Sequence, residues 1–350
     1  MNELDKYVII VIMITFLAAC KYNTNNKFIS NQISKKNYYT LAYDDTLEGN
    51  SFKLQNSLKP RKIDVCDSFI IVINEETINN KLITIYNKFN NKLIKSLGKK
   101  GKGPGELLLP VFISINKQEK TFFVQDGPKM KIYVYPIDSA LYKDSFIPDK
   151  DKFNISIPLQ FSYGIFKVNN ETYITASLKK EEHFVFFKNN QIIKKVGQYP
   201  VIKSIEDKVK NSSNPKSYGI IFQGDYSINP EKINIVHAPM NFNLLYMYNK
   251  YGEKKFIVQI NQSKTSKKYA FRAVHTTKNR IYALYSGKEI KPNNFSGNTL
   301  YIFDWNGKLL KTFYLDIDLK DFCIDKNESK LFGINHNFEN NLIIYNLPKI

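Results

Sequence analysis

The sequence predicts an all-β protein, a six-bladed β-propeller with four antiparallel strands per blade. The first observation is a phrase of strand, turn and strand that recurs six times. The second is an aromatic residue just before each turn, at Tyr86, Tyr135, Phe187, Tyr248, Phe303 and Tyr345. The third is that no long amphipathic helical pattern interrupts these phrases, the best candidate being the short stretch 204–211. Four-stranded units repeating at this period are typical of propellers.

Each phrase predicts a hairpin, and a further pair of strands is predicted before it. The phrases cover 82–98, 131–146, 183–197, 244–260, 299–315 and 341–350. The preceding strands are predicted within 69–74, 111–126, 164–177, 233–239, 270–286 and 321–335. In two hairpins Gly252 and Gly307 stand where the turn needs a positive φ.

The two ends of the chain are predicted to share the last blade. The sixth unit stops at Ile350 after its third strand, and Ser51–Leu58 could supply the fourth. This arrangement would close the ring without a free sheet edge. A seven-bladed ring and a two-sheet sandwich are the alternatives, although a sandwich would not explain six similar units.

The N-terminus predicts a lipoprotein signal peptide over residues 1–19. Tyr7 to Ala19 is apolar except for Thr15, which is too short for a membrane span. The segment 17–20, Leu-Ala-Ala-Cys, resembles the bacterial lipobox, which implies cleavage before Cys20 and lipidation of its sulfur. A signal anchor and an ordinary signal peptide are the alternatives. Residues 20–50 are polar and predict a flexible tether, which leaves 51–350 for the propeller.

The predicted location is the cell envelope, with the membrane contacted through the lipid anchor. No acidic cluster follows Cys20, which favours the periplasmic face of the outer membrane over the cell surface. The net charge is +19, but only three of the 51 basic residues are arginine. Because nucleic-acid readers favour Arg, we expect no nucleic-acid partner. The charge can still favour anionic partners such as acidic glycans or lipid headgroups.

The loop from Gly98 to Pro110 resembles two different motifs. It approaches the phosphate-binding loop pattern, but the required Lys and Ser or Thr are missing and a strand pattern follows instead of a helix. It resembles an NHL-type repeat better, with a glycine-rich lead, an acidic residue and a proline before an inner strand. We therefore expect a structural inter-blade loop formed by Gly101, Gly103, Pro104, Gly105, Glu106 and Pro110.

These features together resemble the TolB-like six-bladed β-propeller lipoproteins of Bacteroidetes. The resemblance covers residues 51–350 and is specific only in the loop; elsewhere it rests on the rhythm of the blades. It implies a fold and a location more than an activity.

Candidate site residues are few. None of the four histidines forms a zinc-binding pair in the sequence. His237 and His275 fall near strand ends in neighbouring blades and could meet at a channel mouth beside Arg272, as candidate ligand-binding residues. No serine-nucleophile motif is present. Cys66 and Cys323, on the inner strands of the first and last blades, could form a disulfide that staples the ring, or could be two buried thiols.

The expected function is a noncatalytic binding or scaffold module for a protein or a cell-envelope glycan, monomeric and without a cofactor. The alternative is a lactonase-type hydrolase with a divalent ion such as Ca²⁺ in its channel. Its candidate ligands would be Asp67, Asn116, Asp225 and Asp325, although Asp and Asn are also ordinary turn residues.

Overall fold

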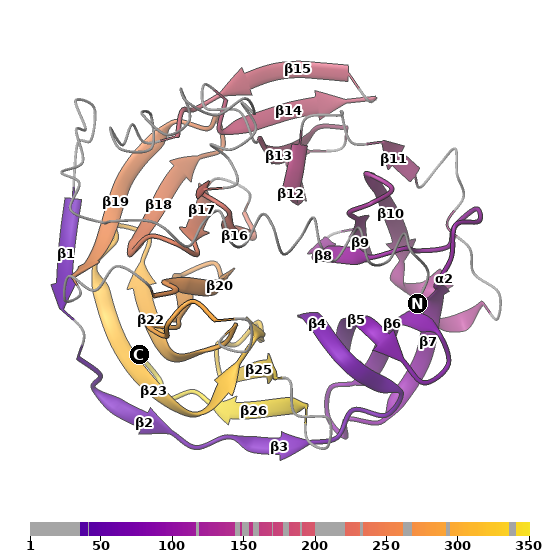
Figure 1. The fold of residues 1–350 in the computed structure, drawn as a ribbon, viewed down its shortest axis with the longest axis horizontal. Helices are drawn as coiled ribbons and strands as arrows, with labels where there is room; N and C mark the ends of the chain where they lie inside the picture. The colour runs from indigo at the N-terminus through magenta and orange to yellow at the C-terminus, as the bar shows by residue number, and fades with distance from the viewer. Residues whose placement is uncertain are drawn as a thin grey trace.

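The computed structural model of the chain describes residues 36–350, apart from 41, 117–118, 144–147, 149–153, 157–160, 170, 178–181, 190, 200–220, 232–233, 262–267, 292–294 and 336–340. Six antiparallel sheets form a ring around a central channel, which confirms the predicted six-bladed propeller (Figure 1). No helix within the described ranges has the length and apolar character needed to span a bilayer.

The strands of each blade follow one another from the channel outward. Blade 1 contains β4 (Ser57–Cys66), β5 (Phe69–Thr77), β6 (Lys81–Asn87) and β7 (Leu93–Lys99). Blade 2 contains β8 (Pro110–Asn116), β9 (Thr121–Asp126), β10 (Lys131–Pro136) and β11 (Asn154–Ser156). Blade 3 contains β12 (Phe161–Lys167), β13 (Tyr173–Ser177), β14 (Phe184–Lys188) and β15 (Gln191–Val196). Blade 4 contains β16 (Gly224–Ile228), β17 (Asn234–Pro239), β18 (Leu244–Asn249) and β19 (Lys254–Asn261). Blade 5 contains β20 (Phe271–Thr276), β21 (Arg280–Tyr285), β22 (Gly297–Asp304) and β23 (Leu309–Leu319). Blade 6 contains β24 (Asp321–Ile324), β25 (Lys330–Ile334), β26 (Leu342–Asn346) and the N-terminal β3 (Asn50–Phe52).

The repeated aromatic residue marks the core between blades. All six side chains at this position are completely buried, at Tyr86, Tyr135, Phe187, Tyr248, Phe303 and Tyr345. Gly252 and Gly307 have φ values of 79° and 77°, as the two predicted hairpin turns require. The local pattern therefore predicted both the packing position and the turn chemistry.

The ring closes in blade 6, where both ends of the chain meet as predicted. β3 pairs antiparallel with β26 through Phe52 opposite Leu342 and Asn50 opposite Ile344. The strand is shorter than the predicted Ser51–Leu58, because Ser57 already begins the inner strand of blade 1. Buried Asn341 fixes the segment between them, accepting the Leu54 N–H at 2.9 Å and donating to the Ser57 carbonyl at 3.0 Å.

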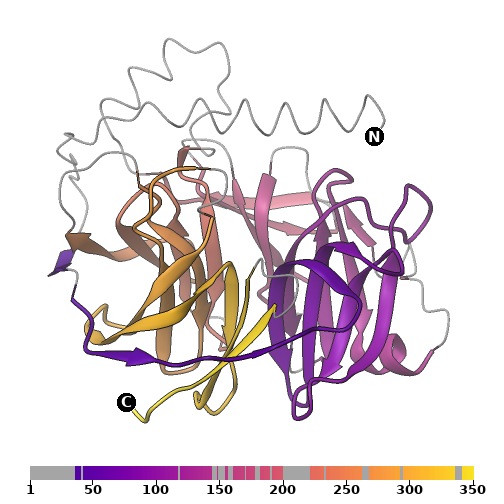
Figure 2. The same cartoon turned by 60° about the horizontal axis from the view of Figure 1, so that its bottom comes forward.

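The prediction of a tether over residues 20–50 is wrong for its last part. β1 (Lys36–Thr40) pairs parallel with β19, and β2 (Asp45–Leu47) pairs parallel with β23, so blades 4 and 5 have five strands. The segment runs around the outside of the ring from blade 4 to blade 6 (Figures 1 and 2). Its backbone satisfies outer edges that would otherwise present unpaired N–H and C=O groups.

The second phrase does not form the predicted hairpin. A short helix, α2 (Ile137–Tyr142), follows β10 directly. Its buried residues Ile137, Ala140 and Leu141 have the spacing of one helical face, and this face packs into the apolar core of blades 1 and 2. The other helical candidate, residues 204–211, lies outside the described residues.

Candidate ligand-binding site in the central channel

A cavity of about 160 Å³ lies in the channel. All six inner strands contribute to its wall. Side chains alternate between the two faces of a strand, so every second residue of an inner strand faces the channel. The polar residues of the wall include Asp64, Ser114, Asn116, Ser227, His275 and Thr276.

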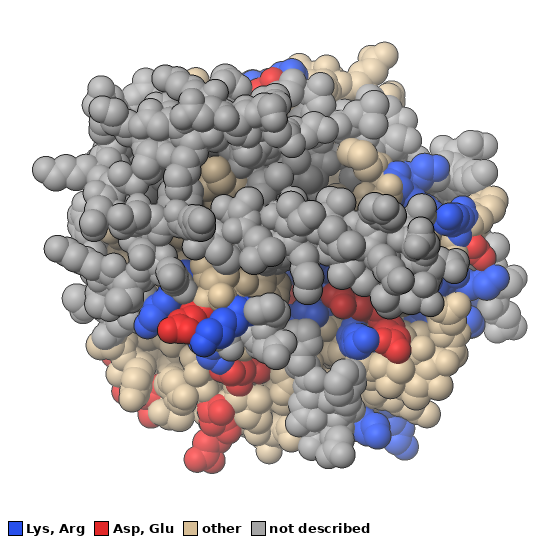
Figure 3. All heavy atoms as spheres, viewed as in Figure 1, with Lys and Arg blue, Asp and Glu red and all other residues tan. Residues whose placement is uncertain are grey.

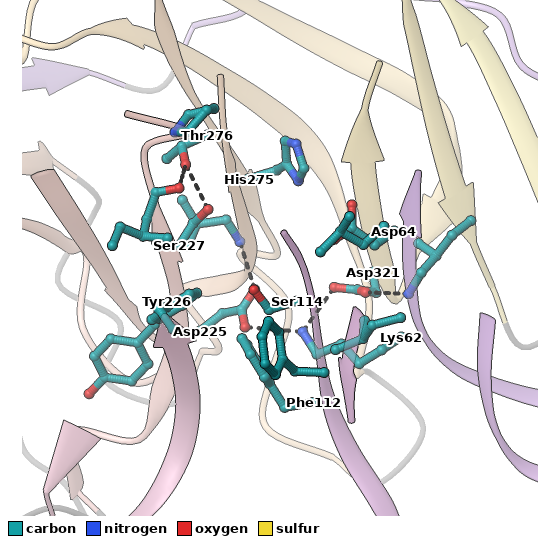
Figure 4. Close-up of a pocket in the computed structure, with 18 of the residues that line it drawn as sticks. Lys62, Asp64, Phe112, Ser114, Asp225, Tyr226, Ser227, His275, Thr276 and Asp321 are labelled. Carbon is teal, nitrogen blue, oxygen red and sulfur yellow. Dashed lines mark hydrogen bonds and ion pairs between the residues drawn. The ribbon is translucent and has the colours of Figure 1, made fainter. Parts of the chain in front are cut away.

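An ion-pair triad of Lys62, Asp225 and Asp321 forms one side of this cavity and joins blades 1, 4 and 6 (Figure 4). The Lys62 Nζ atom lies 3.0 Å from Asp225 Oδ1 and 3.0 Å from Asp321 Oδ1. The second oxygen of each carboxylate accepts a backbone N–H, Asp225 from Val274 at 2.9 Å and Asp321 from Ile63 at 3.0 Å. Four of the six inner strands are thus held together across the channel.

The triad carries one more negative than positive charge. Burial alone would lower the pKa of Lys62, but the two carboxylates outweigh it and raise that pKa. Burial, together with the nearby Asp225 carboxylate, raises the pKa of Asp321 despite its contact with Lys62. Lys62 therefore keeps its proton firmly, and Asp321 takes up a proton more readily than an exposed carboxylate does.

The hydroxyl and amide groups of the wall are partly engaged. The Ser227 and Thr276 hydroxyls lie 2.8 Å apart, and Thr276 donates to the Ile228 carbonyl at 2.8 Å (Figure 4). The Asn116 Nδ2 atom is buried without a hydrogen-bond partner in the described part of the chain, and the whole residue is 6% exposed. A buried amide donor without a partner is costly, so it favours a ligand that offers an acceptor.

The four candidate metal ligands are not brought together. Asn116 and Asp225 line the cavity, but Asp67 lies in the β4–β5 turn with a φ of 46°. Asp325 caps the β24–β25 turn, where it accepts the Ser329 and Lys330 N–H groups at 2.8 and 3.0 Å. Within the described residues no group of three His, Cys, Asp or Glu side chains could hold a metal ion. The Asp225 carboxylate instead binds the Lys62 ammonium.

The predicted meeting of His237 and His275 beside Arg272 is wrong. His275 lines the channel, but His237 lies on the second strand of blade 4 and is completely buried. Its Nε2–H donates to the Phe222 carbonyl at 2.9 Å. Arg272 precedes His275 on β20 but does not line the cavity, because it packs on the ring of Phe295.

His237 belongs to an aromatic cluster between blades 3 and 4, where its ring stacks 4.2 Å from that of Tyr226. His183 joins the same cluster, with its Nδ1 atom 2.7 Å from the Tyr248 hydroxyl. Burial lowers the pKa of His237 to about 3 and that of His183 well below its ordinary value. Both imidazoles are therefore neutral core side chains at neutral pH.

Cys66 and Cys323 lie on the inner strands of blades 1 and 6, as predicted. No disulfide joins these two cysteines, which are the ones within the described part of the chain, and both are buried. The predicted staple is therefore not formed, and each thiol packs with the apolar core around it.

The loop from Gly101 to Pro110 connects the outer strand of blade 1 to the inner strand of blade 2. The Glu106 carboxylate accepts the Gly103 N–H at 2.8 Å and lies 3.1 Å from Lys99 Nζ. These contacts lower the pKa of Glu106. Gly105 has a φ of 70°, which glycine adopts without strain. The geometry is that of a corner in the scaffold, and Pro104 and Pro110 limit its flexibility.

Sequence reasoning missed Lys62, Asp64 and Asp321 as channel residues. They lie in "KIDVC" and "DFCID", where a charge interrupts an apolar strand. That interruption was a usable signal, since charged residues are rarely buried unless they are paired.

The charges on one broad face are mixed. On the described part of the face in Figure 3, Lys and Arg side chains lie next to Asp and Glu. The net charge of +19 therefore does not gather into one basic patch within the described part of this face.

The fold and the site together define a class, the six-bladed propellers with a polar central channel. The sequence matches the family described as TolB-like 6-blade propeller-like over residues 42–327. The chain therefore belongs to the TolB-like six-bladed propeller family.

Solved structures with a similar fold have low sequence identity. One is a protein of Bacteroides fragilis NCTC 9343 assigned as exported, with 12% identity, a TM-score of 0.56, and coverage of 90% of this chain and 100% of that one. Another is a member of the DUF4221 family from Bacteroides vulgatus ATCC 8482, with 11% identity, a TM-score of 0.52 and coverage of 93% and 98%. A third is U3-55K, with 10% identity, a TM-score of 0.53 and coverage of 85% and 98%. The comparison with curated proteins gives no match.

Proposed function

We propose that this protein is a noncatalytic binding module of the cell envelope, with a protein or a glycan as its partner. The observation that carries the proposal is the channel cavity, to which all six inner strands contribute polar or apolar side chains. Ligand pockets of proteins are commonly concave sites where a few polar groups converge on an otherwise apolar wall. The unpartnered Nδ2 atom of Asn116 gives such a ligand a specific hydrogen-bond donor.

The lactonase-type alternative is less well supported by the geometry. A divalent ion in the channel would need several oxygen ligands around one point. Asp225 and Asp321 are the two carboxylates best placed for this, and Lys62 Nζ lies between them. An ion would first have to displace the ammonium group, so we do not assign a metal-dependent reaction to this site.

A lipid anchor at Cys20 is the second part of the proposal. Its support is the lipobox-like segment that ends at Cys20, which lies outside the described residues. The similar fold of a Bacteroides protein assigned as exported is compatible with an envelope location. The periplasmic face of the outer membrane is the proposed site. Metabolic labelling with a palmitate analogue should mark the native chain and not the Cys20→Ser variant.

The binding role is tested by cross-linking the anchored protein in its native envelope, followed by mass spectrometry. Ser114 lines the cavity, so Ser114→Phe should fill the space. The matched control is Ser51→Phe, on the exposed outer strand β3. We expect one dominant partner that is lost in Ser114→Phe and retained in Ser51→Phe. Equal capture of the partner by both variants would show that the partner does not bind in the channel cavity.

A further inference from the structure

The guanidinium of Arg272 is buried, and within the described residues no carboxylate forms an ion pair with it. The residue is 7% exposed, and its Cζ atom lies 3.1 Å from the Phe295 ring centroid and 5.8 Å from that of Tyr269. Its Nε and Nη1 atoms are buried and have no hydrogen-bond partner among the residues that the structure describes. A buried cation without a partner is costly, and proteins normally supply a carboxylate or bind a ligand there.

Three neighbouring charges complete an "entry cluster", which we define as Arg61, Glu75, Arg272 and Lys320. Glu75 Oε1 lies 3.0 Å from Arg61 Nη1 and 3.6 Å from Lys320 Nζ. Burial lowers the pKa of Lys320, and the positive charges of Arg61 and Arg272 lower it further. Arg272 is therefore close enough to Lys320 for their charges to interact.

The charge balance singles out Arg272. The entry cluster and the adjacent ion-pair triad together contain the cations Arg61, Lys62, Arg272 and Lys320 and the carboxylates Glu75, Asp225 and Asp321, and Asp64 lies in the same channel wall. Each cation except Arg272 has one of these carboxylates within 4 Å. Burial lowers the pKa of Arg272 to about 10, so the side chain keeps its charge at neutral pH. The carboxylates of Asp225 and Asp321 act on Arg272 only at longer range, where they partly offset the effect of burial on its pKa.

We propose that Arg272 is the anchor of an oxyanion-binding site, which takes a carboxylate or phosphate group of an envelope ligand. The inference rests on the proposed binding function and specifies a chemical class of ligand. A guanidinium suits this role because it is always charged and presents several N–H donors to an oxyanion. The ring of Phe295 supports its face through a cation–π contact.

This site is separate from the channel cavity. Arg272 precedes Val274 and His275, which line the cavity, by two and three residues on the same strand. At about 3.3 Å per residue the two sites are roughly 7–10 Å apart along β20. The oxyanion site thus lies toward the end of the channel at which the inner strands begin.

Thermal unfolding of the detergent-solubilised full chain tests the proposal with three probes at equal ionic strength. Galacturonate supplies a carboxylate, inorganic phosphate supplies a phosphate, and galactose is the neutral control. We expect Tm to rise with the concentration of at least one oxyanion, since a ligand that binds only the native state stabilises it. Galactose and sodium chloride should leave Tm unchanged. A Tm rise with galacturonate alone indicates a carboxylate ligand such as a uronic acid, and a rise with phosphate alone indicates a phosphate group.

Variants separate a binding role from a packing role. Arg272→Met should abolish the oxyanion response and change the Tm of the ligand-free protein little, because the relief of burying the guanidinium offsets the loss of its attraction to Asp225 and Asp321. Arg272→Lys keeps the charge but lacks the planar fork, and its response should be at least tenfold weaker. Lys278→Met, at a 71% exposed side chain, is the control and should respond like the native protein.

Two results would overturn the proposal: no Tm rise with either oxyanion, or an undiminished rise in Arg272→Met. The proposed binding function would survive either result if Ser114→Phe still lost its cross-linked partner. Conversely, an intact oxyanion response with no partner lost in Ser114→Phe would keep this site and reject the channel cavity.

Discussion

At the scale of single residues, Lys62 compensates buried charge in more than one blade. It is the shared cation of two buried carboxylates that belong to different blades. A pair exposed on the surface contributes little to stability, whereas removing one partner of a buried group leaves uncompensated charge in the interior. The main effect of Lys62 is therefore to compensate the buried negative charge of Asp225 and Asp321.

We expect Lys62→Met to lower the free energy of unfolding by about 3 kcal/mol at pH 7. Without the ammonium, burial raises the pKa of Asp321 without opposition, so this carboxylate binds a proton more readily in the native state than in the unfolded chain. The variant should therefore lose less stability than the native protein as pH falls from 7 to 5, a range in which the buried histidines destabilise both. Urea denaturation at both pH values measures this. Lys59→Met, which removes a half-exposed partner of Glu76, should change stability by less than about 1 kcal/mol.

The two buried histidines predict a loss of stability in acid. As pH falls below 6.5, the unfolded chain takes up protons at His237 and His183 that the native core does not bind, so the unfolding free energy falls; for His237 this continues to about pH 3. Each group contributes up to about 1.4 kcal/mol per pH unit. The groups that face them are tyrosines and one lysine: Tyr199, Tyr226, Tyr246, Tyr248 and Lys254.

Chemical denaturation at pH 7, 6 and 5 checks this expectation. The His237→Gln variant keeps a side-chain donor for the Phe222 carbonyl but does not titrate. Its stability should depend less steeply on pH than that of the native protein. Parallel slopes for the two proteins would mean that His237 is not the group responsible.

At the scale of elements, β16 and β17 approach each other too closely for a side chain at Gly224. A Cβ atom there would lie 2.1 Å from the Ala238 carbonyl oxygen and 2.5 Å from the Pro239 Cα atom. Because both contacts are with backbone, the strand pair would have to separate. We expect Gly224→Ala to lower the unfolding free energy by roughly 1–3 kcal/mol, measured by urea denaturation.

Gly127→Ala is the matched control for this substitution. Its Cβ atom would come no closer than 3.2 Å, to a methyl group of Val111, which can adjust. A loss in Gly127→Ala as large as that in Gly224→Ala would show that the effect does not come from the spacing of β16 and β17.

The elements also show what local sequence patterns can and cannot predict. Six buried aromatics and two glycine turns were predictable because each is set by residues close in sequence. The parallel pairing of β1 with β19 and of β2 with β23 was not predictable. An edge strand can pair through its backbone alone, so it leaves only a weak hydrophobic pattern in the sequence. The triad joins residues 163 and 259 positions apart, and no local signal indicates which strands become neighbours.

At the scale of the whole molecule, the ring depends on its N-terminal segment. A chain that begins at Lys36 keeps β1, β2 and β3 and should unfold at the same temperature as the full chain. A chain that begins at Lys53 lacks all three strands, so β19 and β23 lose their outer neighbours, β26 loses its pairing partner and blade 6 has a free edge. We expect a clearly lower Tm and increased aggregation, measured by calorimetry and light scattering. Equal Tm values for the two chains would show that β3 is dispensable.

The order of β1, β2 and β3 along the chain has a mechanical consequence. The three strands lie on blades 4, 5 and 6 in turn, so a pulling force applied at the N-terminal end reaches β1 first and β3 last. The first two strands can peel away, and rejoin when the load falls, while blade 6 stays shut. If the chain is tethered by its N-terminal end, the reversible detachment of β1 and β2 takes up the load before it reaches the ring.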